Sequence, residues 1–244
     1  MKFFAVKSSK IEFFTEVKGL ADQAPPVPAG KLLPEWYKKI PEFEGPRVDG
    51  SGAKMRGVNT DVKRCPGIRD FIGSGFIIPL WCDYNIDVEP DGSLNWLAPD
   101  GAFKLGSHPV EQLQGMPQEH PYPAIKFINP WFVRTPPGYS CLFLPPFYEF
   151  EKRFTVLPGV VDTDFYHNAH LPTLLHINPG KSMLLERGTP IVHVFPFKRE
   201  EMDSDCREAS EEDERAIAKF QLGVRSTFDS NYRKTQKERS DANE

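Results

Sequence analysis

Proline is the residue that most limits how this chain can fold, because 24 of its 244 residues are proline. A proline ring fixes φ and removes a backbone donor, so it interrupts helices and central strands. Only short strands, turns and extended segments fit between so many interruptions. The 19 phenylalanines provide a large apolar area on few residues, which suits a core built from short strands. We therefore predict a mainly β fold.

The most regular part of the sequence alternates short apolar runs with turn residues such as Pro136-Pro137-Gly138 and Asn178-Pro179-Gly180. A turn at about every 8–12 residues favours an antiparallel sandwich or a barrel-like body over a parallel sheet. The strands of this body are expected at residues 125–128, 131–134, 139–144, 154–157, 173–177, 182–185 and 190–197.

Residues 75–88 are rich in apolar residues and predict one long strand upstream of this body. The turn residues at 90–93 predict a hairpin with a strand at 94–97. A helical turn is expected at 65–72, and the glycine-rich segment 45–60 is expected to be a mobile loop.

Residues 23–46 contain six of the prolines and predict an extended arm. Pro34 is suited to the first position of a single helical turn, in which Trp36 and Tyr37 would anchor the arm on the body. At the other end of the chain, Ser210 and the acidic residues after it predict the start of a helix. The apolar face of that helix is expected to contain Ile217, Phe220, Val224, Phe228 and Tyr232.

These segments divide the chain into an N-terminal β-containing region with the arm (1–120), an antiparallel core (121–200), and a C-terminal helix with a charged tail (201–244). We expect the three parts to form one structural unit, because the arm and the helix both offer apolar faces that need cover. The helix could cover its own β body or a neighbouring copy, so a homo-oligomer is one expectation.

The net charge of −4 disfavours a nucleic-acid polymer as partner, because such partners select basic surfaces. A small anionic ligand or a nucleotide needs only a few local donors and stays open. No apolar run approaches the roughly 20 residues needed to cross a bilayer, so no membrane partner is expected. The four cysteines are scattered and predict reduced thiols in a cytoplasmic protein.

The densest polar cluster runs from Gly159 to His170 between two apolar segments, and it contains two aspartates, Asp162 and Asp164. Two carboxylates at the rim of a β body need partners, and they indicate either a functional site or a polar network. Catalysis by a thiol is poorly supported, because Cys141 lies within a predicted strand and nothing in the sequence supplies a base for Cys65.

Three segments, Thr135–Pro145, Pro158–Asp164 and Glu186–Val194, resemble the β-clip core shared by dUTPases and dCTP deaminases. The resemblance implies a β-clip-like core, an acid/base role for Asp162, and stacking of a base on Phe165 or Tyr166. Asp164 and Arg134 are expected to lie at the same pocket, with Asp164 as a second catalytic carboxylate and Arg134 as a ligand-binding residue. The segment from Tyr148 to Arg153 departs from that family, because its glutamates replace residues that hold phosphates. Triphosphate hydrolysis is therefore not expected.

Several stretches along almost the whole chain also resemble a family of bacterial and marine phage proteins whose activity is not established. The resemblance implies a place in the host cytoplasm or in the virion, and its stretches are Pro34–Pro41, Lys63–Pro66, Gly75–Leu80, Arg134–Ser140, Gly159–Asp164 and Gly188–Val192.

A third hypothesis is a metal site for an oxygenase, because Asp162, Asp164, His167, His170 and His176 are close in sequence, with His193 on a later strand. Two imidazoles and a carboxylate on one face can bind iron, although the H-x-D or H-x-E pair that usually supplies them is missing from the sequence. The sequence thus leaves three function classes open: a binding protein for a small ligand or nucleotide, an assembly protein, and a metal-dependent oxygenase. It identifies no cofactor and does not decide whether the protein is an enzyme.

Overall fold

The structure is a computed structural model. It describes residues 10–41, 44–48, 51–52, 54–60, 62–99, 101, 103–107 and 124–226. Contacts group these residues into two units, which are described separately: one made of residues up to 32 and 74–200, and one made of 33–73 and the residues from 201 onward.

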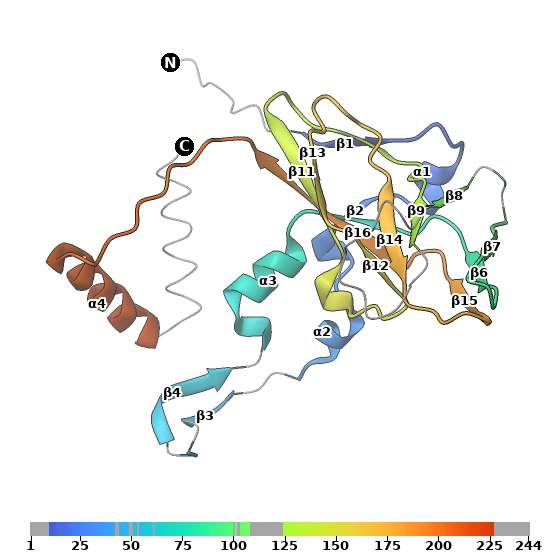
Figure 1. Cartoon of the computed structure of the whole chain (residues 1–244). Coiled ribbons are helices and arrows are strands. Elements are labelled where there is room, and N and C mark those ends of the chain that lie inside the picture. The colour runs from blue at the N-terminus through green and yellow to red at the C-terminus, as the bar shows by residue number, and fades with distance from the viewer. Residues whose placement is uncertain are drawn as a thin grey trace. The chain divides into compact units, whose positions relative to one another are not determined.

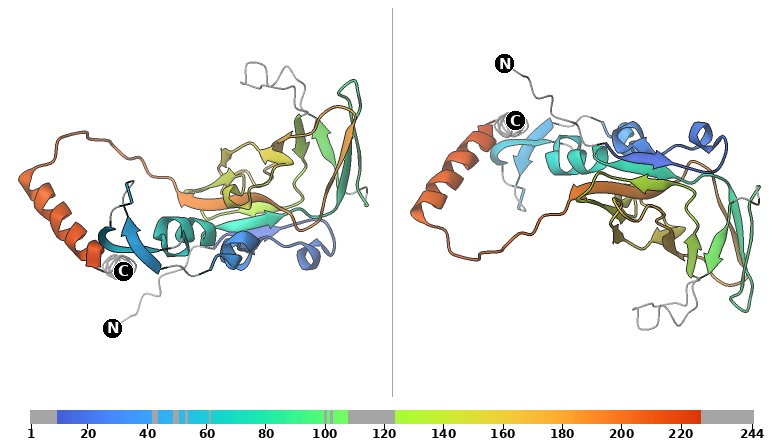
Figure 2. Two further views of the ribbon diagram at one scale, coloured as in Figure 1. Left: turned by 90° about the horizontal axis from the view of Figure 1, so that it is seen from below. Right: turned by 90° about the horizontal axis from the view of Figure 1, so that it is seen from above.

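The fold of the first unit is mainly β, as predicted, and its sheets are antiparallel (Figure 1). Its largest sheet has the order β13-β11-β16-β5-β2. Figure 2 shows β5 in teal and β16 in orange running side by side, and β2 pairs with β5 as well. None of the sheets closes into a barrel in the described part of the chain. The strands of this sheet are β2 (Val27–Pro28), β5 (Phe76–Pro79), β11 (Tyr139–Leu144), β13 (Gly159–Val161) and β16 (Pro190–Lys198).

Three smaller sheets complete the first unit. The four-stranded one has the order β12-β14-β9-β8, the three-stranded one β15-β6-β7, and the two-stranded one pairs β1 with β10. Their strands are β1 (Glu12–Phe14), β6 (Tyr84–Val88), β7 (Leu94–Leu97), β8 (Leu105–Ser107), β9 (Ala124–Phe127), β10 (Phe132–Arg134), β12 (Phe154–Val156), β14 (Leu171–Leu175) and β15 (Lys181–Leu185). The helical pieces of this unit are α1 (Leu20–Gln23) and the 3-10 turns η1 (Ala29–Lys31) and η4 (Phe147–Glu149).

One hydrophobic core joins these sheets. Phe143 and Val194 from the five-stranded sheet lie in the same cluster as Phe127 and Leu171 from the four-stranded sheet. Burial alternates along β14, where the residues at 171, 173 and 175 are buried while those between them are half-buried, whereas β5 and β16 contain continuous buried runs. The core also includes Val133, which places β10 against the body.

The segment from Gly75 to Val88 forms two strands in two different sheets, so the prediction of one long strand is wrong. The chain turns between β5 and β6, where Trp81 is buried and its indole N–H donates to the hydroxyl oxygen of Tyr84 at 2.9 Å. The backbone N–H of Leu80 donates to Thr189 O at 2.7 Å, which holds this turn against the start of β16. The predicted hairpin to residues 94–97 is confirmed as β6 and β7.

The seven strands predicted between residues 125 and 197 form close to their predicted ranges, with β14 beginning at Leu171, two residues before the predicted start. The edge strand β13 was not predicted. Strands from both sides of residue 120 share sheets, since β5 pairs with β16 and β8 pairs with β9. Residue 120 is therefore not a boundary between sheets.

The second unit contains the remaining helices and one strand pair. The helices are α2 (Glu35–Lys39), α3 (Pro66–Gly73), α4 (Glu211–Ser226) and the 3-10 turn η2 (Val62–Arg64). The predicted mobile loop at 45–60 is wrong for its described residues, because β3 (Glu44–Val48) and β4 (Lys54–Thr60) pair antiparallel. Gly52 has a φ of 85°, a left-handed conformation that suits glycine in the turn between them.

The helical turn predicted after Pro34 and the helix predicted after Ser210 are both confirmed. Pro34 directly precedes α2, in which Tyr37 is buried. Ser210 caps α4: its hydroxyl accepts from the backbone N–H of Asp213 at 3.3 Å, and the Asp213 carboxylate accepts from the backbone N–H of Ser210 at 2.8 Å. Phe228 and Tyr232, expected on the same helix, lie outside the described residues. No helix in the described ranges has both the length and the apolar character needed to cross a bilayer.

Candidate functional site

The two aspartates predicted as a site lie in a tight turn that follows the edge strand β13. This strand pairs with β11, so that Val161 lies opposite Cys141. The backbone N–H groups of Phe165 and Tyr166 both donate to Asp162 O, at 3.0 and 2.7 Å. The turn therefore holds its aspartates and its aromatic residues in one fixed backbone conformation.

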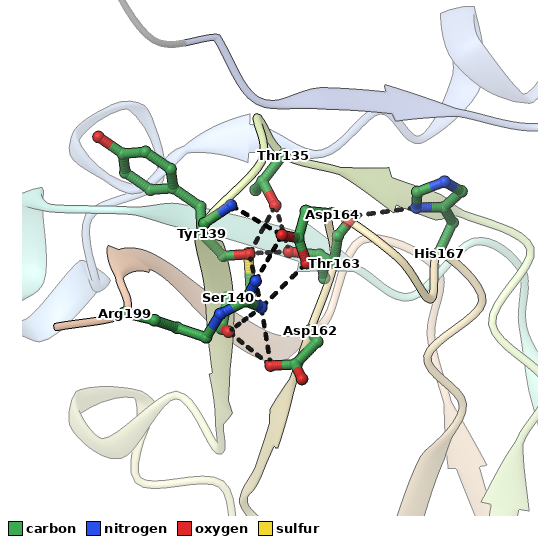
Figure 3. Close-up of polar contacts among 10 residues, drawn as sticks. Thr135, Tyr139, Ser140, Asp162, Thr163, Asp164, His167 and Arg199 are labelled. Carbon is green, nitrogen blue, oxygen red and sulfur yellow. Dashed lines mark hydrogen bonds and ion pairs between the residues drawn. The ribbon is translucent and has the colours of Figure 1, made fainter. Parts of the chain in front are cut away.

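Arg199, just beyond the end of β16, binds both aspartates (Figure 3). Its guanidinium donates to both oxygens of Asp164, at 2.9 and 2.5 Å, and to Asp162 Oδ1 at 3.1 Å. The backbone N–H of Gly138 donates to Asp164 Oδ2 at 2.8 Å, and the hydroxyl of Ser140 donates to Asp162 Oδ1 at 2.6 Å. We call Gly138, Ser140, Asp162, Asp164 and Arg199 the Arg199 clamp.

The hydrogen bonds of the Arg199 clamp lower the pKa of both carboxylates. The Arg199 hydrogen bond, followed by the Gly138 N–H, lowers the pKa of Asp164. The Ser140 hydroxyl, followed by Arg199, lowers the pKa of Asp162. A general base at neutral pH works best with a pKa near the working pH, and both groups are shifted away from that value. The geometry pairs both carboxylates with the charge of Arg199.

Thr163 lies between the two aspartates in the sequence, and its side chain points into the protein interior. The Thr163 side chain is buried, and its hydroxyl lies 2.7 Å from the hydroxyl of Thr135 and 3.3 Å from Cys141 Sγ. Burial raises the pKa of the Cys141 thiol, which fits the inert thiol expected from its place in a strand.

Arg134, predicted as a ligand-binding residue, lies on β10 next to this turn. The turn runs along one side of β10, where the N–H of Val133 donates to His167 O at 2.9 Å and the N–H of Thr135 donates to Thr163 O at 3.2 Å. Strand β1 runs along the other side, with Glu12 opposite Arg134 and Phe14 opposite Phe132.

The guanidinium of Arg134 lies over the ring of Phe14. Its Cζ is 4.7 Å from the centroid of the Phe14 ring, and Phe14 stacks on Phe132 with centroids 5.2 Å apart and ring planes 14° apart. The guanidinium also pairs with the Glu12 carboxylate at 3.5 Å. A cation in this position is held by the ring face while its edge reaches solvent.

The two aromatic residues predicted to stack on a ligand are exposed. Phe165 is 87% accessible and Tyr166 is 53% accessible. Both residues belong to the turn whose backbone bonds to β10. We call Arg134, Phe14, Phe132, Phe165 and Tyr166 the aromatic rim.

The histidines predicted as metal ligands have separate surroundings. His167 Nδ1 lies 2.9 Å from Thr163 O, and His176 Nε2 lies 2.7 Å from Thr155 Oγ1. His170 Nδ1 is buried and has no hydrogen-bond partner among the described residues, and burial, followed by the charge of Lys126, lowers the pKa of His170. Among the residues that the structure describes, no three His, Cys, Asp or Glu side chains are grouped to hold a metal ion.

His193, the more distant candidate, is buried on β16. Its Nε2 lies 2.6 Å from Ser74 O, and burial lowers the pKa of His193 although the Ser74 carbonyl acts in the opposite direction. This arrangement fits a histidine that holds the start of β5.

The sequence did not indicate Arg199, Ser140, Glu12 or Phe14 as parts of a site. Three strands separate Arg199 from Asp164 in the sequence. The two residues meet because β13 and β16 both pair with β11. Glu12 and Phe14 are two residues apart and lie on one face of β1, a spacing that the sequence shows. Their partner strand β10, however, is more than 110 residues away.

Comparison with models of protein families and with curated protein sequences finds no match.

Proposed function

We propose that this protein binds a small ligand that carries both a planar ring and a negative charge, and that it does not hydrolyse the ligand. The observation that carries this proposal is the aromatic rim. It combines a guanidinium held on a ring with two exposed aromatic side chains on the neighbouring turn. Arginine recognises carboxylates and phosphates, and aromatic rings stack on planar groups.

The state of the aspartates supports binding without catalysis. Asp164 has only 11% of its side chain accessible and is held by Arg199 and Gly138. Asp162 is more open, but its lowered pKa makes it a poor proton acceptor.

Nucleotides are the ligand class that we propose first, because they combine a planar base with phosphate. The resemblance of residues 135–194 to the β-clip of dUTPases and dCTP deaminases supports the same class. It also supports a nucleotide-binding origin in which the phosphate-holding segment has been replaced by Tyr148–Arg153.

The experiment is a binding measurement by calorimetry and thermal shift with a panel of nucleotides, nucleosides and inorganic phosphate. A ligand that binds the native state raises the melting temperature. Arg134→Gln is expected to weaken binding of the charged ligands, and Phe165→Ala with Tyr166→Ala is expected to weaken binding of all ring ligands. Leu97→Ala is a matched control, because Leu97 is an exposed apolar residue of similar accessibility, 70%, on β7.

The proposal fails if no member of the panel binds, or if binding is equally strong in the rim variants and the Leu97 control. Chromatography of the nucleotides after incubation tests the second part of the proposal. Accumulation of a hydrolysed product that is lost in Asp162→Asn would show that the protein is an enzyme.

Assembly is a second candidate function, supported by α4. Ile217 and Phe220 lie three residues apart on this helix, and both are about half exposed. We propose that this face packs on a second copy of the chain. Light scattering of the wild type and of Ile217→Ser/Phe220→Ser tests this: an unchanged molar mass excludes assembly through α4.

A further inference from the structure

We infer that Glu12 is a built-in competitor for the ligand's negative charge at Arg134, an inference that rests on the proposed function. Glu12 and Arg134 lie directly opposite each other on β1 and β10. Glu12 Oε2 accepts from Arg134 NH1 at 3.5 Å, and Glu12 Oε1 lies 3.5 Å from Lys10 Nζ. The carboxylate is therefore shared between two cations, at long distance from each.

The register of the two strands places the competitor on the same face as the ring contacts. Phe14 follows Glu12 by two residues, so both side chains leave β1 on one side, together with Phe132 and Arg134 from β10. The intervening residues Phe13 and Val133 point to the other side, where Val133 is buried in the core. The ion pair consequently lies on the outward face, where a ligand can reach it.

Phe14 keeps the guanidinium in place whichever anion it binds. Arg134 Cζ lies 4.7 Å from the Phe14 centroid, and the Phe14 ring is itself held by Phe132 at 5.2 Å and by the edge of His167 at 6.3 Å. Replacement of one anion by another does not require Arg134 to leave this stack. The ring thus acts as a positioning residue, and Glu12 occupies the position that a ligand anion would take.

The contact between Glu12 and Arg134 is weak enough to be displaced. Both side chains are about half exposed, and an exposed single-contact ion pair contributes little to stability. A phosphate or carboxylate that accepts two parallel N–H bonds binds arginine more strongly. Glu12 would therefore lower the affinity for every ligand anion and would not affect the binding of an uncharged ring. Only an anion that accepts two N–H bonds from Arg134 would displace Glu12 easily, so Glu12 favours such ligands over weaker anions.

The experiment compares AMP, which has a ring and an anion, with adenosine, which has the ring alone. Calorimetry is performed on the wild type, Glu12→Gln and Glu16→Gln. Glu16 is an exposed glutamate four residues further along the same segment, so the Glu16 variant carries the same charge change. We expect Glu12→Gln to raise the affinity for AMP by about 2- to 5-fold and to leave the affinity for adenosine unchanged.

A further variant tests the positioning role. Phe14→Leu keeps an apolar side chain but removes the ring face, and it is expected to weaken AMP binding by about 2- to 5-fold. The combination of Phe14→Leu with Glu12→Gln separates the two roles, because removing the competitor should still raise the affinity. Circular dichroism and the melting temperature of each variant show whether β1 remains folded.

The outcomes distinguish this inference from the proposed function. AMP binding that is equal in the Glu12 and Glu16 variants overturns the inference and leaves the proposed function standing. An equal rise in affinity for AMP and adenosine also overturns it, because the effect would not act on the anion. If neither AMP nor adenosine binds to any of these proteins, the inference and the binding of nucleotides fall together.

Discussion

Arg199 and Asp164 form a two-pronged ion pair in which one guanidinium donates to both oxygens of one carboxylate. The pair joins the residue after β16 to the turn after β13, and the backbone N–H of Arg199 also donates to Gly138 O at 2.8 Å. Since β13, β11 and β16 are neighbours in one sheet, the Arg199 clamp ties the ends of three adjacent strands together. Arg199 is followed by Glu200, the last residue of the first unit, so the clamp holds the chain where that unit ends.

The first prediction concerns the acid sensitivity of the Arg199 clamp. A carboxylate whose pKa is lowered in the folded state stabilises the fold above the ordinary aspartate pKa of about 3.9, and this stabilisation is lost as the pH falls through the lowered value. The difference in free energy of unfolding between the wild type and Asp164→Asn should be largest near neutral pH and should shrink below about pH 4. Urea denaturation at a series of pH values measures it.

Arg199→Gln and the double variant serve as controls for this prediction. If the pair acts as one unit, the double variant should be hardly less stable than either single variant at neutral pH. A stability difference between the wild type and Asp164→Asn that stays constant down to pH 3 would contradict the lowered pKa of Asp164.

The general fold could be predicted because its signals are local. Prolines, glycines and alternating apolar residues mark strand after strand between residues 124 and 198, and each mark depends on neighbours within a few positions. The break at Leu80–Asp83 could not be predicted in this way. Residues 76–82 are all apolar, and what interrupts the strand is the packing of Trp81 and the bond from Leu80 to Thr189, more than 100 residues away.

The candidate site shows the same limit. Asp162, Asp164, Phe165 and Tyr166 form one continuous segment, so a single polar cluster in the sequence indicates them together. Their partner Arg199 is one of many charged residues near the C-terminus, and nothing local distinguishes it. For the histidines at 167, 170 and 176 the local signal was misleading. Their closeness in sequence suggested one set of metal ligands, but in the structure His167 and His176 bind separate partners.

The second prediction concerns the buried hydroxyl pair Thr135 and Thr163. Thr163→Val keeps the shape of the side chain but removes one of the two partners of the Thr135 hydroxyl, which also donates to Tyr139 O, so it should cost about 1–2 kcal/mol of unfolding free energy. Thr155→Val is the comparison, because its bond to His176 is exposed, and it should cost less. The double variant Thr135→Val/Thr163→Val should cost less than the sum of its single variants, because both partners leave together. Additive losses would show that the two hydroxyls do not interact.

The third prediction concerns thiol reactivity. Cys65 and Cys206 are exposed, whereas Cys82 and Cys141 are buried, and burial raises the pKa of the Cys141 thiol. Iodoacetamide at pH 8 should therefore modify Cys65 and Cys206 in the native protein and modify the other two only after unfolding. Peptide mass spectrometry assigns the modified positions. Prompt modification of Cys141 in the native protein would show that β11 opens readily.

The last prediction concerns the glycine at the entry to β5. Gly75 has a φ of 71°, and a Cβ at this position would collide with the backbone oxygen of Val194 on the neighbouring strand β16. In Gly75→Ala the alanine would have to adopt the left-handed conformation and would also collide with Val194. We therefore expect the free energy of unfolding to fall by about 3 kcal/mol or more. Gly92, in the turn between β6 and β7, has a φ of 84° with open space around it, so Gly92→Ala should lose only about 1–2 kcal/mol. Urea denaturation measures the free energy of unfolding of both variants. The difference between the two losses gives the cost of the collision, because both variants have the cost of the left-handed conformation. Equal losses would mean that β5 and β16 move apart easily at this end, and the close approach of Gly75 to Val194 would then contribute nothing to the stability of the sheet.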